Sequence, residues 1–296
     1  MDVKRLSIIL CMIFAILSAK SQTSMSLEEV KELRLKLLNM IDLMSKESDG
    51  AKRLSMNREF DKRFGQLLSA SEIPGMNKDS LPLISTLTSP DASFSIHTWE
   101  VEGPEGDMHY FGYVKSKKGE QKAIVFHLQD SSATMDRPEY IQARAHRWYG
   151  ALYYDMRQVR HKKETYYILL GINRSRRLTK ERIVETAWVD DQVYFGKEVF
   201  DEGKAAMKKR LIYPHNTDTD MTLVFEDDET IVLDHLSPES PAFEGKFEYY
   251  VPDMSYDAWL LKKGNWVYKA DHDARLAPNL KDRYYEMDLP EQKKVY

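Results

Sequence analysis

Two stretches near the middle of the chain, 148–157 (WYGALYYDMR) and 166–172 (YYILLGI), decide the fold. The second stretch is almost continuously apolar, as expected for a strand that is buried on both faces of its sheet. In the first stretch Trp148, Tyr154 and Met156 alternate with Tyr149, Ala151 and Tyr153, so both of its faces carry large or apolar side chains. We therefore expect a central pair of strands that is covered on both sides.

Further strands flank this central pair, because short runs of alternating apolar and aromatic residues are separated by Gly, Pro, Asp and Asn. The expected hairpins are 94–101 with 108–114, 108–114 with 123–128, 221–225 with 230–236, and 258–261 with 266–268. Segment 136–147 is less regular and carries Pro138 at what could be the first turn of a short helix. No glycine-rich strand-to-helix turn indicates a parallel sheet. The sequence predicts a large antiparallel β-domain over residues 93–279, either barrel-like or a sandwich.

Two amphipathic helices precede the strands. Ser26 and Glu29 have the spacing of a capping box, and apolar residues then recur every three or four positions until Asp49-Gly50. A second pattern runs from Met56 to about Ala70. We interpret residues 22–76 as a helical hairpin that packs on the main domain rather than as a coiled coil, because two heptads are too few. The Ser-, Pro- and Thr-rich segment 77–92 is expected to be a connector, and 280–296 a C-terminal tail. The fold class is therefore α+β, mainly β.

The first 21 residues have the pattern of a secretory signal peptide. Lys4 and Arg5 precede an uncharged apolar run at 6–19, and small residues at 19 and 21 predict cleavage between Ser21 and Gln22. The apolar run is too short for a membrane anchor, so no membrane span is expected after cleavage. A lipoprotein would need its cysteine after the apolar run, whereas Cys11 lies inside it. The sequence predicts an exported protein.

Composition narrows the possible partners. The formal net charge is −4, and loss of Lys4, Arg5, Lys20 and Asp2 with the leader makes the mature chain more acidic. A general nucleic-acid binder would need a basic excess, so no nucleic-acid partner is expected. Cys11, the only cysteine, is lost with the leader, so stability must come from a packed core rather than from disulfides.

Several long blocks of sequence are similar to a known family. They include WYGALYY at 148–154, YYILLG at 166–171, VLDHLSP at 232–238, PDMSYD at 252–257 and DHDAR at 271–275. Over about residues 94–279 the chain resembles a family of uncharacterised exported proteins of the Bacteroidota. The resemblance implies a periplasmic or secreted setting in a Gram-negative bacterium, and it implies no activity.

The most concentrated set of polar side chains is Asp271-His272-Asp273 with Arg275, after the last hairpin. Carboxylates and imidazole could hold a cation, but in an extended segment His272 would point away from both aspartates. We therefore predict no metal and no cofactor, and an ordered loop instead. Asp253 and Asp257 complete the candidate ligand-binding set.

Four other features have plainer explanations. In the strand 230–236 Asp234 and His235 diverge, and His235 is expected to be a core histidine. The segment 216–220 (NTDTD) imitates a calcium loop but lacks its glycine and closing Glu, so we expect a turn. The basic residues of 174–182 could bind phosphate, but a solvated loop is favoured. His127 with Ser131 and Ser132 does not support a catalytic triad. Tryptophan and tyrosine rings could stack on sugars, although core packing explains them equally well.

Two functions follow from these observations. The favoured one is a non-enzymatic exported β-rich protein that binds an unknown ligand or envelope protein, with the helical hairpin packing on the β-domain or mediating association. The alternative is a hydrolase of envelope or dietary polymers that uses a carboxylate pair from Asp253, Asp257, Asp271 and Asp273 as acid and base.

Overall fold

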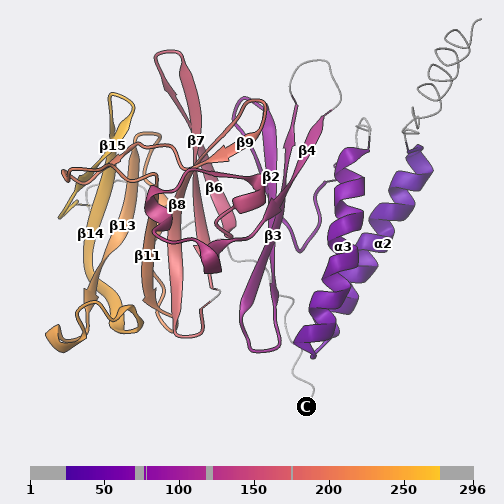
Figure 1. Ribbon diagram of the computed structural model, residues 1–296, viewed down its shortest axis with the longest axis horizontal. Helices are drawn as coiled ribbons and strands as arrows, with labels where there is room; N and C mark the ends of the chain where they lie inside the picture. Colours follow the sequence, from indigo (N-terminus) through magenta and orange to yellow (C-terminus); the bar gives the residue numbers. More distant parts are fainter. Residues whose placement is uncertain (1–24, 71–76, 78, 118–122, 175, 274–296) are drawn as a thin grey trace, which may run out of the picture.

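The computed structural model describes residues 25–70, 77, 79–117, 123–174 and 176–273. The predicted leader with its expected cleavage site at Ser21 and Gln22, the candidate site residue Arg275 and the predicted C-terminal tail lie outside these residues. Within the described part, helices α2 (Leu27–Lys46) and α3 (Gly50–Ser69) precede strands that pair into three sheets (Figure 1). None of the described helices combines the length and apolar character that a membrane span requires.

The three sheets are mostly antiparallel, and none closes into a barrel. The first sheet has the order β1 (Ser85–Thr88), β2 (Phe94–Glu102), β3 (Met108–Ser116), β4 (Ile124–Gln129). The middle sheet has the order β5 (Ala143–Arg144), β9 (Val193–Phe195), β8 (Thr179–Val189), β7 (Glu164–Asn173), β6 (Leu152–His161), with β11 (Arg210–Asn216) also beside β8. The third sheet has the order β10 (Phe200–Asp201), β15 (Asn265–Lys269), β14 (Tyr250–Lys262), β13 (Thr230–Pro238), β12 (Leu223–Phe225). Only β10 and β15 pair in parallel among the described strands. The predicted mainly β, antiparallel fold is confirmed.

The middle sheet is buried on both faces. Leu169 and Ile183 on one face belong to a core that also contains Phe94 from the first sheet. On the other face, Ile168 and Leu170 belong to a core with Trp259 and Trp266 of the third sheet. Figure 1 shows the resulting order of layers from helices to first, middle and third sheet. The apolar run 166–172 therefore predicted the position of β7 correctly, because a strand between two cores has no polar face.

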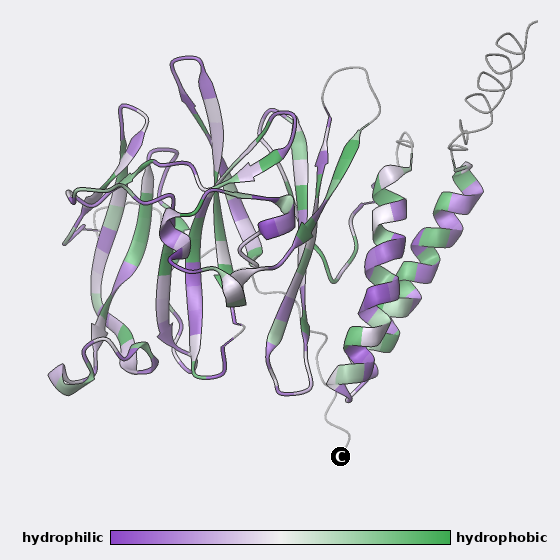
Figure 2. Ribbon diagram, in the orientation of Figure 1, coloured by the Kyte–Doolittle hydropathy of each residue, from purple (hydrophilic) through white to green (hydrophobic). Residues whose placement is uncertain are grey.

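The helices begin at side-chain caps. Ser26 Oγ accepts from the Glu29 amide, and the Glu29 carboxylate accepts from the Ser26 amide at 2.7 Å, which confirms the capping box. Asp49 was expected to help end the first helix, but its carboxylate caps α3 by accepting from the amides of Ala51 and Lys52. The second helix therefore starts before the apolar pattern at Met56. Both helices alternate hydrophobic and hydrophilic segments along their length (Figure 2).

Helix α3 packs on the first sheet around Trp99, which is fully buried. Phe60 and Phe64 meet its indole edge-on, and Asn57 Oδ1 accepts from its Nε1 at 2.8 Å. At the start of the helix, a Cβ added to Gly50 would lie 2.4 Å from the backbone of Gly103. Gly50 is thus required by a close approach between helix and sheet, rather than by the end of α2.

Two local expectations differ from the structure, and a third is confirmed. The expected connector 77–92 contains β1, in which Ser85 Oγ donates to the Tyr153 carbonyl and Thr86 Oγ1 lies 3.0 Å from His97 Nδ1. Strand β6 begins at Leu152 rather than at Trp148, and a bulge between Tyr153 and Asp155 changes the face of later residues. Pro138 begins a short helix, as expected, and this is the 3₁₀ helix Pro138–Tyr140.

Candidate functional site

The candidate site lies where the pairing of β13 with β14 is interrupted. Asp234 pairs with Tyr256 and Leu236 pairs with Pro252, so residue 235 alone lies opposite residues 253–255. The extra residues of β14 form a turn in which Asp253 Oδ1 accepts from the amide and the hydroxyl of Ser255, at 3.0 and 2.6 Å. Between them Met254 adopts φ 71°, an unfavourable angle for a residue with a side chain, and is 95% exposed. The bulge turns His235 out of the regular alternation of β13.

Asp257 joins three elements at this bulge. One carboxylate oxygen lies 2.8 Å from His235 Nδ1 of β13 and accepts from the Tyr268 hydroxyl of β15 at 2.6 Å. The other oxygen accepts from the Asp271 amide at 3.3 Å. Asp257 is only 5% exposed, and a carboxylate that is buried to this extent needs such hydrogen-bond donors. These contacts fix the orientation of the His235 ring.

The environment of His235 favours its protonated form. The hydrogen bond to Asp257 raises the pKa of His235; burial opposes this, and the nearby charges of Asp253 and Asp271 add to the increase. A raised folded-state pKa means that this interaction stabilises the fold fully below a pH of about 6.5 and is lost as the pH rises through the folded value. The His235 side chain is 43% exposed, so a ligand can reach the ring.

The two neighbouring polar groups have fixed protonation states. Burial tends to raise the pKa of Asp253, but hydrogen bonds from Ser255 and Ser237 outweigh it, so its pKa lies below the ordinary value. Burial, with the adjacent Asp257 carboxylate, raises the pKa of the Tyr268 phenol well above its usual value. At neutral pH the Asp253 carboxylate is therefore held ionised and the Tyr268 phenol acts as a donor.

The structure brings together three of the five predicted ligand-binding residues. Asp257 contacts His235, the Asp271 amide donates to Asp257, and the charges of Asp253 and Asp271 both raise the pKa of His235, whereas Asp273 is exposed and lies at the edge of the described part. His272 turns to another partner, with its Nε2 3.2 Å from Glu226. Asp271 has φ 52°, so the segment is not extended there, and the divergence of the aspartates from His272 that was expected for an extended segment is not tested. Among the described residues no three His, Cys, Asp or Glu side chains form a group that could hold a metal ion.

His235 was missed as a functional residue. It was expected to be a core histidine, and this is wrong, because the two extra residues of β14 break the alternation on which that expectation rested. The Asp-x-Ser spacing at 253–255, which allows a side-chain turn within a strand, was the available signal.

Most cations of the basic run have partners, which argues against an anion site; Arg182, for example, donates to the Met221 carbonyl at 2.9 Å. Arg174 pairs with Glu100, Arg176 with Glu181 and Lys180 with Asp220. The neighbouring NTDTD segment is a turn, as predicted, in which Asn216 Oδ1 accepts from the Asp218 amide at 2.7 Å.

The other candidates are also structural. His127 lies 3.1 Å from Asp61 of α3 rather than near Ser131 or Ser132. Four of the five tryptophans, at positions 99, 148, 259 and 266, are fully buried. The fifth, Trp188, stacks on Tyr194 with ring centroids 5.1 Å apart and has the Lys197 ammonium 5.8 Å from its centroid. These rings are used in packing, so they offer no obvious platform for a sugar.

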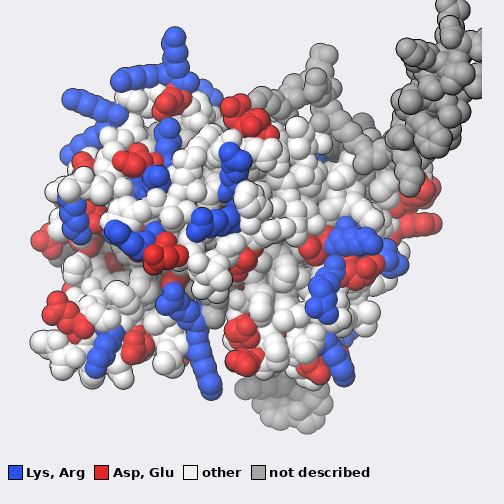
Figure 3. Space-filling view, in the orientation of Figure 1, with Lys and Arg blue, Asp and Glu red and all other residues white. Residues whose placement is uncertain are grey.

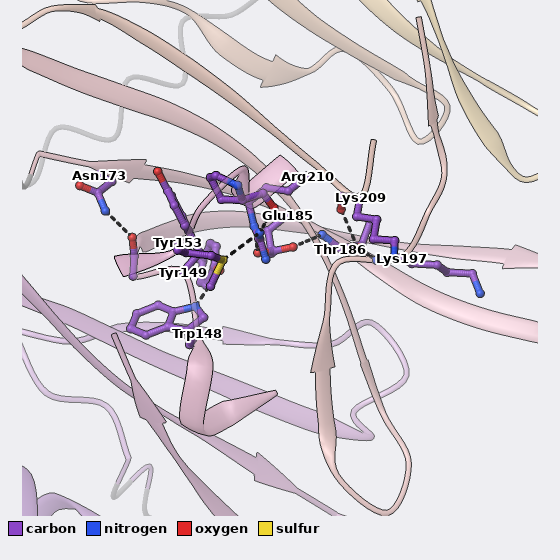
Figure 4. Close-up of polar contacts among 12 residues, drawn as sticks. Trp148, Tyr149, Tyr153, Asn173, Glu185, Thr186, Lys197, Lys209 and Arg210 are labelled. Atoms are coloured by element: carbon purple, nitrogen blue, oxygen red, sulfur yellow. Dashed lines mark hydrogen bonds and ion pairs between the residues drawn. The ribbon is translucent and has the colours of Figure 1, made fainter. Parts of the chain in front are cut away.

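A second polar cluster lies in the interior (Figure 4). Arg210 of β11 and Glu185 of β8 are cross-strand neighbours, form an ion pair and are both fully buried. Arg210 Nη1 also donates to the Pro138 carbonyl at 2.6 Å, and its guanidinium lies over the Tyr149 ring. Because no atom of this pair reaches solvent, we assign it to the stability of the fold.

Comparison of the chain with protein-family models, with curated proteins and with solved structures gives no match.

Proposed function

We propose that this chain is an exported, non-enzymatic β-rich protein of the cell envelope that binds a ligand carrying an amino or guanidinium group at His235. The observation that carries the proposal is the hydrogen bond between Asp257 and the half-exposed imidazole of His235, with the charges of Asp253 and Asp271 near enough to raise the pKa of His235 further. The hydrogen bonds to Asp257 hold the site in one arrangement before any ligand arrives, which reduces the entropic cost of binding.

The charge of the site supports a cationic ligand. Asp253 and Asp271 are exposed, and hydrogen bonds keep Asp253 ionised. Even with His235 protonated, the three carboxylates outnumber the single imidazolium. A primary ammonium or guanidinium group satisfies such carboxylates by charge-assisted hydrogen bonds.

Catalysis by a carboxylate pair receives less support from the same contacts. A glycosidase acid needs a raised pKa, whereas that of Asp253 is lowered. Both oxygens of Asp257 already accept hydrogen bonds from within the protein. A serine nucleophile is not positioned either, since Ser237 and Ser255 donate to Asp253 rather than to His235. The hydrolase therefore stays the second hypothesis, and an experiment has to distinguish it from ligand binding.

Argininamide and spermidine are suitable probes, with maltoheptaose as the uncharged control. We expect both cations to raise the melting temperature of the protein at millimolar concentration, because a ligand that binds only the folded state stabilises it. Asp253→Asn is expected to weaken argininamide binding at least tenfold in calorimetry, since one charged hydrogen bond contributes about 1.5–3 kcal/mol.

The matched control is Asp228→Asn, which removes an 88% exposed carboxylate from the β12–β13 turn. It should leave argininamide binding unchanged. Absence of any response to both cations, or equal loss in the two variants, would refute the proposal. Turnover of a chromogenic ester or glycoside by the wild type, abolished by His235→Ala, would establish the hydrolase instead.

A further inference from the structure

We propose that the adjoining tips of the β6–β7 and β14–β15 hairpins form a basic surface that docks on an anionic lipid bilayer. The two tips lie about a hundred residues apart in the sequence. In Figure 1 they lie side by side at the upper edge of the molecule, beyond the packed part of the middle and third sheets. The proposal does not depend on the His235 site.

The tips are held in direct contact. The Tyr166 hydroxyl of β7 donates to the Gly264 carbonyl in the β14–β15 turn at 3.0 Å. A Cβ added to Gly264 would lie 2.6 Å from the His161 ring, and Gly264 has φ 86°, so only glycine fits there without strain. The two tips therefore present their side chains as one surface of fixed geometry.

This surface carries five exposed cations, here called the tip cations. They are Arg160, Lys162, Lys163, Lys262 and Lys263. No ion pair involves any of them within the described part of the chain, whereas the one acidic residue of the first tip, Glu164, pairs with Lys197 at 3.1 Å. Figure 3 shows Lys and Arg side chains projecting from this upper left part of the molecule. Such a cluster is unexpected in a chain with a net charge of −4.

The turn positions support a role for the charge itself. Lys162 has φ 55° and Lys263 has φ 53°, both in the left-handed region where Gly, Asn or Asp is usual. Lysine adds nothing to the turn geometry at these positions. Two lysines at unfavourable angles on neighbouring tips point to a selected positive charge.

The shape of the surface favours a bilayer over a single bound anion. Phosphate and sulfate are gripped by the forked guanidinium of Arg, but four of the five tip cations are lysines, which act as point charges. They project from hairpin ends, which suits contact with a flat array of headgroups. Clusters of four to eight Lys and Arg residues bind anionic leaflets in this way, and each residue near the surface increases the affinity about fivefold. The acidic side chains elsewhere on the protein do not prevent this contact, because repulsion between their charges and the lipid headgroups is screened beyond about 8 Å at physiological salt.

The test is co-sedimentation of the full chain with vesicles of phosphatidylcholine containing about one third phosphatidylglycerol. We expect binding that is absent with pure phosphatidylcholine and that falls steeply as salt increases, because exposed charges are screened. Changing the four tip lysines to Gln should lower the partition coefficient at least twentyfold, allowing for incomplete contact of each lysine.

The matched control changes Lys31, Lys36, Lys46 and Lys52 of the helices to Gln, which removes the same total charge elsewhere. It should retain most of the binding, and thermal melts should show that both variants fold. No binding of the wild type to anionic vesicles overturns the proposal, as does equal loss in both variants. Binding to soluble dextran sulfate without binding to vesicles overturns it in favour of a soluble polyanion.

Discussion

Replacing Arg210 by Leu is expected to lower the free energy of unfolding by about 3–5 kcal/mol, because it leaves Glu185 buried without a countercharge. Both side chains are fully buried between β8 and β11, and burial already raises the pKa of Glu185 despite Arg210. Without Arg210 the carboxyl must take up a proton or remain as an unpaired charge. Chemical denaturation at pH 7.5 measures the loss, which should be smaller at acidic pH, where protonation of Glu185 costs less.

A double variant separates the effect of the unpaired charge on stability from the effect of lost packing. Removing both partners, with Arg210→Met and Glu185→Leu, should recover most of the stability, since a buried ion pair can be replaced by apolar side chains of similar volume. The surface control Lys46→Leu breaks an exposed pair with Asp42 and should change stability by less than about 1 kcal/mol. If Arg210→Leu lowers the free energy of unfolding by as little as the control does, the assigned role of the pair is contradicted.

Trp99→Ala should destabilise the protein by about 3–5 kcal/mol and loosen the helices from the first sheet. The indole is fully buried and lies against rings of α3 and β3, at centroid distances of 5.6 Å to Phe60 and 5.8 Å to Phe111. Its loss leaves a cavity and also removes the hydrogen bond to Asn57, whose amide stays buried. Denaturant unfolding measures the stability, and hydrogen exchange should show faster opening of α2 and α3 than of β7.

The control for this variant is Trp188→Ala. Trp188 is partly exposed and stacks on Tyr194 at the β8–β9 hairpin, so its removal creates little cavity and should cost distinctly less. If the two variants lose equal stability, or if exchange in α2 and α3 is unchanged by Trp99→Ala, then Trp99 does not anchor the helices as described.

The predictable part of the fold is the part set by local pattern. The apolar run of β7 and the hairpins around 103–106 and 226–229 follow from alternation and turn residues, and they are confirmed. The stacking of three sheets could not be predicted, because it depends on which faces meet, as Leu169 and Ile168 do on opposite sides of one strand. Similarly, Gly50 marks an approach to Gly103 that is more than fifty residues distant.

The candidate site was only partly predictable for a related reason. Asp253, Asp257 and Asp271 stood out as carboxylates in adjacent hairpins, and the structure brings them together. His235 did not stand out, because regular alternation placed it in the core. The bulge that exposes it is built by the Asp253–Ser255 turn on the opposite strand, so no reading of β13 alone reveals it.

The central claim, that Asp257 holds His235 as a preformed and accessible site, is tested most directly by NMR titration of the His235 ring. The account predicts a pKa above the ordinary value of 6.5 in the wild type, a lower pKa in Asp257→Asn, and a shift of the His235 resonances when argininamide is added. A pKa at or below 6.5 that is unchanged by Asp257→Asn, with no response to argininamide, would contradict it.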